Sequence, residues 1–363
     1  MTIDALQSAQ YEVDDLDAAI ELYFERGWTD VLPVVPPTEA KVMRFLETVQ
    51  RQPGEVIGEY PSRKRVVRVE KVAINAVMAG CRPEYFPVVL AIVEAMMERR
   101  FGLHIANAST GSMNLGFIVN GPIRKALGMN SAGNVLGPGN RANSTIGRAV
   151  RLVQINVMGS VPGAGGDDGA GDRDVLDRST MGHPAKYAGY HIPENEEEFP
   201  TLEPVHVQLG FAPDDSVVTV FGAAGSMVIS AHEDHGADRI VDTIAHNLAG
   251  SGKLANMFCV IILPPECARY FVADGWTKRH IQEALLERTT RSVAWLRSNG
   301  WSPPGSPIEP RGGPVQPGDE ETMAAIARRP EDIVVAVAGG PAGAFVHAIL
   351  PYAGTPVARK INT

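Results

Sequence analysis

A glycine-rich loop that runs into a helix constrains this chain more than any other stretch. It spans residues 129–151, MNSAGNVLGPGNRANSTIGRAVR. Gly133, Gly137 and Gly139 allow tight turns or positive φ angles, and the Asn, Ser and Thr residues that follow are typical helix caps. Such loops commonly connect a strand to a helix. The stretch matches neither the phosphate loop of NTPases nor the dinucleotide-binding fingerprint.

The same stretch predicts a binding site for an anion. The N-terminus of a helix exposes free N–H groups and the positive end of the helix dipole. Arg141 and Arg148 add positive charge nearby. We therefore expect an anion site at the 133–145 loop, and the alternative is a loop that only connects two elements. The candidate substrate-binding residues are Arg82, Asn140, Arg141, Asn143, Ser144 and Thr145.

Composition and charge exclude several classes of protein. The chain has 363 residues, a formal net charge of −9 and 44% hydrophobic residues. An acidic balance argues against a nucleic-acid or anionic-membrane partner, because both need clustered Lys and Arg. No apolar run approaches the roughly 20 residues of a membrane span. The N-terminus lacks the pattern of a signal peptide, so we expect a cytoplasmic location.

The pattern of apolar runs and turn residues predicts an α/β fold. We expect mixed or mainly parallel sheets covered by helices in two α/β portions, 1–158 and 202–363. The segment 159–201, rich in Gly and Asp at its start, is expected to be a flexible connection or lid. Segments 222–236 and 341–352 are expected as loops, the latter with a helix as the alternative. Strands are expected at 66–70, 103–106, 115–119, 217–221, 257–263, 333–338 and 356–361.

Cys81 is the candidate nucleophile. It follows Gly80, precedes Arg82 and lies at the expected start of a helix. A helix N-terminus and a neighbouring arginine both lower the pKa of a thiol, and the thiolate is the reactive form. The alternative is a small buried packing residue. Cys259 and Cys267 show neither a CxxC motif nor zinc-ligand spacing.

A second candidate site lies in the sequence AHEDHGAD. His232, Asp234 and His235 offer imidazole and carboxylate ligands within four residues, a set that suits zinc, iron or manganese. A divalent transition metal is therefore the candidate cofactor. Without a metal, Asp234 could orient His235 as a general base. His104, His183 or His191 could supply a further ligand, and His104 is also a candidate catalytic residue near an expected strand end.

A second glycine-rich loop is a further candidate anion site. It contains Gly339, Gly340 and Gly343, which follow an apolar run.

Five segments together resemble a little-characterised bacterial family of cytoplasmic proteins: GWTDVLPVVPPTEAKV, EKVAINAVMAGCRPEYFPVVLAIVEAM, NGPIRKALGMNSAGNVLGPGNRANSTIGRAVRL, GHPAKY and DGWTKRHIQEAL. Members are often encoded beside small proteins with a UGSC motif, in which U is selenocysteine or cysteine. The resemblance implies a small thiol or selenol protein as a partner, because this chain has no UGSC motif itself.

Three functions are compatible with these features. The leading one is an enzyme, of lyase or hydrolase class or with thiol-dependent chemistry, that acts on a small polar or anionic molecule. The second is a metal-dependent hydrolase or lyase built on the 232–235 loop. The third is a non-catalytic subunit that partners a small thiol or selenol protein. In each case we expect a homo-oligomer.

Overall fold

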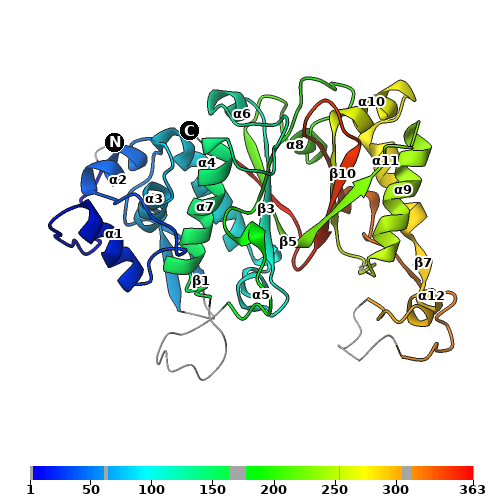
Figure 1. Ribbon diagram of the computed structural model, residues 1–363, viewed down its shortest axis with the longest axis horizontal. Helices are drawn as coiled ribbons and strands as arrows, with labels where there is room; N and C mark the ends of the chain where they lie inside the picture. The colour runs from blue at the N-terminus through cyan, green and yellow to red at the C-terminus, as the bar shows by residue number, and fades with distance from the viewer. Residues whose placement is uncertain (1–2, 61–63, 163–176, 253, 305–312, 363) are drawn as a thin grey trace.

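The computed structural model describes residues 3–60, 64–162, 177–252, 254–304 and 313–362 and shows a sheet with helices on both sides (Figure 1). The strands of this sheet follow the order β4-β3-β5-β10-β6-β9, and β11 pairs with the first part of β5. They are β3 (Asn114–Asn120), β4 (Tyr190–Pro193), β5 (Val217–Ser230), β6 (Cys259–Leu263), β9 (Ile333–Val337), β10 (Phe345–Pro351) and β11 (Val357–Lys360).

The sheet is mixed. The pairs β3–β4 and β6–β9 are parallel, and all other pairs of this sheet are antiparallel. The predicted α/β fold with a mixed sheet is therefore confirmed. Strands from both expected portions share this one sheet, and the expected boundaries at 158 and 202 stay a prediction.

Apolar residues bury both faces of the sheet. Along β6, Cys259, Ile261 and Leu263 pack against helices, while Val260 and Ile262 join a separate cluster on the opposite face. This alternation follows from the two-residue period of a strand, and burial of both faces explains why such strands are continuous apolar runs. The covering helices near β3 are α3 (Val69–Met78), α4 (Phe86–Met97) and α7 (Arg141–Asn156), and those near β6 are α9 (Ala237–Gly250), α10 (Pro265–Ala273) and α11 (Lys278–Thr289).

The remaining elements are small strand pairs and further helices (Figure 1). Two-stranded pairs form between β1 (Val56–Tyr60) and β2 (Arg65–Arg68) and between β7 (Arg291–Ser292) and β8 (Met323–Ala324). The other helices are α1 (Leu16–Glu25), α2 (Glu39–Leu46), α5 (Leu103–Ala108), α6 (Ile123–Ala126), α8 (Val205–Gln208) and α12 (Val293–Ser298). Among the described residues, no helix is long and apolar enough to cross a membrane.

Three expected segments differ from the structure. Residues 103–106 were expected as a strand but belong to helix α5. The loop expected after residue 221 is a continuation of β5 to Ser230, because pairing with β10 holds Gly225, Ser226 and their neighbours extended. The segment 345–351, expected as loop or helix, is the β10 partner in that pairing. In all three, long-range pairing or packing overrides local propensity.

The sheet is curled, so that its two edge strands, β4 and β9, approach each other at one end. The backbone N–H of Asn195, just after β4, donates to the carbonyl of Val337 in β9 at 2.7 Å. Beside this contact lies a fully buried ion pair between Glu194 and Lys278 of α11. Residues 163–176 of the expected flexible connection lie outside the described residues. The described remainder of that connection contributes β4 to the sheet.

Candidate functional site

Helix α7 begins where the glycine-rich loop ends, as the sequence predicts. The Asn140 side chain caps it by accepting a hydrogen bond from the backbone N–H of Asn143 at 3.0 Å. The buried amide of Asn143 turns back to Asn130, accepting from its N–H at 3.1 Å and donating to its carbonyl at 2.9 Å. Both asparagines therefore hold the loop on the helix, and their role in substrate binding stays a prediction.

The two glycine-rich loops lie against each other. The N–H of Gly339 donates to the carbonyl of Ser131 at 2.9 Å, and Ala132 forms an isolated bridge with the same glycine. Val135, in the middle of the first loop, is buried in the same apolar cluster as Val260 and Ile262 of β6. Val135 therefore anchors the predicted anion loop on the protein, while Ala132, Gly133 and Asn134 stay exposed, and the positive charge lies further along, at Arg141.

Arg141 joins the start of α7 to the end of α3. Its guanidinium donates from Nε and Nη2 to the carbonyl of Gly80 at 3.0 and 2.9 Å. Gly80 has a φ of +84°, and the N–H groups of Gly80 and Cys81 return to Val77 and Ala76. This is a Schellman ending of α3, which explains the glycine at this position. The structure thus brings Cys81 and Arg141 to the same junction between α3 and α7.

A cavity of about 380 Å³ opens beside this junction. Four cationic side chains line it: Lys41 and Arg44 from α2, Arg82 after α3, and Arg141 at the start of α7. We call it the cationic cavity. One carboxylate, that of Glu84, also lines it. Sequence analysis missed Lys41 and Arg44, and the only signal for them is their spacing of three residues on one helix face.

The cations of this cavity have no acidic partners. Within the described part of the chain, none of the four has a carboxylate oxygen within 4.0 Å. Arg148 differs, because Asp30 binds its Nε and Nη2 at 2.9 and 2.8 Å. Burial alone would raise the pKa of Asp30, but the hydrogen bond and charge of Arg148 outweigh it and leave that pKa below its usual value. Arg148 is therefore neutralised, while the cavity keeps an excess of positive charge.

The thiol of Cys81 lines the cavity in its protonated form. Burial raises the pKa of Cys81 to about 12, and the hydrogen bond to the Thr145 carbonyl and the charges of Arg141 and Arg148 only partly oppose this. The expected lowering of the Cys81 pKa is therefore wrong. The physical reason is the position of Cys81: it follows the end of α3, and the next turn begins only at Pro83.

Ser144 and Thr145, two further predicted binding residues, lie in the first turns of α7. Thr145 Oγ1 donates to the Arg141 carbonyl at 2.7 Å.

His104 lies in α5 and not at a strand end. Its Nδ1 is 3.0 Å from the Tyr60 hydroxyl of β1, and its side chain is exposed. The strand-end position predicted for His104 is wrong because residues 103–106, expected as a strand, are helical. His104 is not among the residues that line the cationic cavity.

The 232–235 loop follows β5 and spreads its side chains apart. His232 Nδ1 pairs with Ser230 Oγ at 3.0 Å, and His235 Nδ1 lies 3.1 Å from the Tyr270 hydroxyl. Asp234 is buried. Among the residues that the structure describes, no three His, Cys, Asp or Glu side chains are placed to hold a metal ion. The metal and general-base hypotheses for this loop stay predictions, without a ligand cluster to support them.

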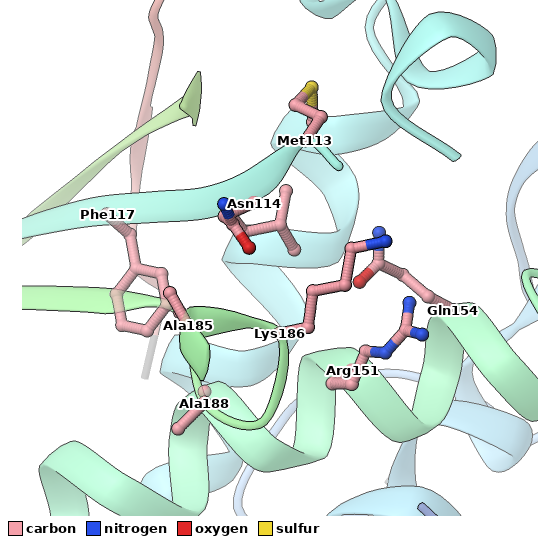
Figure 2. A pocket seen from close by; sticks show the side chains of 11 residues that line it. Met113, Asn114, Phe117, Arg151, Gln154, Ala185, Lys186 and Ala188 are labelled. Carbon is pink, nitrogen blue, oxygen red and sulfur yellow. The ribbon is translucent and has the colours of Figure 1, made fainter. Parts of the chain in front are cut away.

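Sequence analysis missed a buried charged cluster that includes Arg151 of α7 and Lys186, both shown in Figure 2. Asp177 accepts from Arg151 Nη2 at 3.1 Å and from Lys186 Nζ at 2.7 Å. Burial lowers the pKa of Lys186, and the opposing charge of Asp177 does not fully compensate. The available signal is the motif HPAK, in which the His183 Nδ1 caps the turn that carries Lys186 by accepting from the Ala185 N–H at 3.0 Å.

This Asp177 cluster borders a cavity of about 10 Å³, room for roughly one water molecule. Figure 2 shows the polar ends of Lys186, Gln154 and Arg151 pointing into the same region. Asn114 also lines it, and its buried Oδ1 has no partner among the described residues. The cluster ties the 177–189 segment to α7, and its cavity is too small for an organic substrate.

The cationic cavity combines the volume of a metabolite site with several predicted residues. It contains Cys81, Arg82 and Arg141, whereas His104 and the 232–235 loop lie on other elements. The resemblance to a bacterial family stays a prediction, since a scan against family models, a search of the curated proteins and a search of the solved structures each found no match.

Proposed function

We propose that this chain is an enzyme that binds a small anionic molecule in the cationic cavity. One observation carries the proposal: four cationic side chains, none with an acidic partner among the described residues, line one cavity in a chain whose formal net charge is −9. Arg and Lys form charge-assisted hydrogen bonds with carboxylate and phosphate, and such bonds are about twice as strong as neutral ones. An anion would relieve the mutual repulsion of the four cations.

The state of Cys81 bears on the class of reaction. A thiol with a pKa of about 12 carries too little thiolate at neutral pH to act as a resting nucleophile. Among the predicted classes, this favours lytic or hydrolytic chemistry over attack by Cys81. Thiol-dependent chemistry would then need a thiol from a small molecule or from the partner protein that the resemblance implies.

Isothermal titration calorimetry with inorganic phosphate and with citrate tests the binding site. We expect Arg44→Gln and Arg82→Gln each to weaken anion binding about tenfold or more, because a hydrogen bond to a charged group contributes about 1.5–3 kcal/mol. Binding by the wild-type protein should also weaken as KCl is raised. Arg239→Gln on the exposed face of α9 is the matched control and should bind like the wild type. Equal affinities in all four proteins would refute the site.

A cytoplasmic location and a homo-oligomer remain proposals. The apolar helix α4 does not supply an interface for the second, because Phe86 and the residues to Val93 are buried in the core of one chain. Light scattering coupled to size-exclusion chromatography measures the oligomeric state directly.

A further inference from the structure

The cationic cavity has a second wall, and that wall is apolar. Val35, Phe45, Val77 and Pro83 line it together with the protonated thiol of Cys81. A buried, neutral cysteine behaves as a small hydrophobic residue. Phe45 is fixed in place by Phe86 of α4, whose ring lies edge-on with the centroids 6.0 Å apart. The lining of the cavity therefore combines cationic side chains with a firm apolar surface.

The two walls are adjacent along the chain as well as in space. On α2, Lys41, Arg44 and Phe45 have the spacing of one helix face, so the same helix supplies both kinds of side chain. At the end of α3, the apolar Cys81 directly precedes the cationic Arg82. A ligand bound by the guanidinium groups must consequently also cover the apolar wall.

Resting on the proposed function, we infer that the ligand is an amphiphilic organic anion: a carboxylate or phosphate group attached to an aromatic or branched apolar body. An inorganic anion would leave the apolar wall in contact with water, so burial of that wall would contribute nothing to its affinity. A sugar phosphate would press its hydroxyls against side chains that cannot hydrogen-bond them, which carries a desolvation cost. The apolar wall thus selects the body of the ligand, and the cations select its head.

Calorimetric titration of the full chain with three matched probes tests this inference: phenyl phosphate, inorganic phosphate and glucose 6-phosphate. We expect phenyl phosphate to bind at least about tenfold more tightly than the other two. Benzoate against acetate repeats the comparison with a carboxylate head. Both pairs should show the same preference for the aromatic member, because the wall contacts the body and not the head.

Variants of each wall separate the two contributions. Val35→Ser and Phe45→Leu should reduce the preference for phenyl phosphate and leave the affinity for inorganic phosphate unchanged. Val35 is 40% exposed, so Val35→Ser is compatible with folding, and Val66→Ser at a position 41% exposed and outside the cavity is its matched control. Arg44→Gln should weaken all three phosphates alike.

The outcomes distinguish this inference from the proposed function. Equal binding of the three phosphates, weakened by Arg44→Gln, would overturn the amphiphilic ligand and leave the anion site standing. A preference for phenyl phosphate that Val35→Ser and Phe45→Leu leave intact would also overturn it. If no probe binds, both the anion site and its apolar selectivity are wrong.

Discussion

The thiol of Cys81 lies near two arginines and still keeps its proton. Removal from water destabilises the thiolate by more than the neighbouring positive charges stabilise it, so burial raises the pKa of Cys81 to about 12. Burial raises the pKa values of Cys259 and Cys267 to about 12 as well. The electrostatic effect of Arg141 is also limited because its guanidinium is exposed and bonded to the Gly80 carbonyl.

The cysteines should therefore be unreactive in the folded protein. At pH 8 a thiol with a pKa of about 12 is ionised in roughly one molecule in ten thousand. We expect Ellman's reagent to titrate none of the three thiols within minutes in the native protein, and all three after unfolding in guanidinium chloride. A rapidly reacting thiol that disappears in Cys81→Ser would show that Cys81 is accessible and ionised.

At the residue scale, the sequence predicted part of the candidate site. Cys81, Arg82 and Arg141 could be grouped because glycine and cap residues mark the element ends where they lie. Lys41 and Arg44 could not, because charged residues on one helix face usually indicate a solvated surface. The error in placing His104 had a different cause, since the four residues 103–106 are too few to distinguish a short helix from a strand.

At the scale of elements, α7 is held by a contact that admits no side chain. Gly147 lies in the middle of α7, and a Cβ atom added there would overlap the carbonyl oxygen of Ala188. The same face of α7 carries Arg151, which binds Asp177. Close approach of the 184–189 segment to the helix therefore depends on a glycine in a position where helix propensity alone would favour alanine.

Gly147→Ala should destabilise the protein despite that propensity. Overpacking a rigid backbone contact costs about 1–3 kcal/mol, and the gain in helix propensity offsets at most about 1 kcal/mol of it. Gly250→Ala in α9 is the matched control, because the added Cβ meets no atom within 4 Å. Urea unfolding followed by circular dichroism should show a lower midpoint for Gly147→Ala only. A raised midpoint in both variants would mean that the 184–189 segment moves away without cost.

Elements bounded by clear turn and cap residues were predictable, and those defined by distant partners were not. Thr277, a cap-type residue, lies at the start of α11 and forms a capping box there with His280. By contrast, little local in residues 222–226 favours a strand, since glycine and alanine dominate them. Their extended conformation comes from hydrogen bonds to β10, more than a hundred residues later in the chain.

At the scale of the whole molecule, one ion pair lies where the edges of the curled sheet meet. Lys278 and Glu194 are almost completely buried, and Glu194 Oε2 also accepts from Asn120 at 2.6 Å and from the Val205 N–H at 2.8 Å. Glu194 itself follows β4, and its partners lie at the end of β3 and at the starts of α8 and α11. The carboxylate thus joins segments from widely separated parts of the sequence.

Lys278→Met should be strongly destabilising. It leaves the carboxylate of Glu194 buried without its cation, and breaking a buried pair in this way costs about 3–5 kcal/mol. The control is Lys125→Met, which removes an exposed lysine 3.1 Å from Glu197 and should change stability by no more than about 0.5 kcal/mol. Similar unfolding free energies for the two variants, measured in urea, would argue that the Glu194 carboxylate is protonated or hydrated in the folded state.

The pairing of β11 with the first residues of β5 has a consequence for synthesis on the ribosome. Val357 lies opposite Val220, and Arg359 binds Glu94 of α4 with an Nε to Oε2 distance of 2.6 Å. The N-terminal helices therefore gain their last neighbours only when residues 357–360 have left the exit tunnel. Until then the nascent chain exposes the backbone edge of β5 with which β11 later pairs.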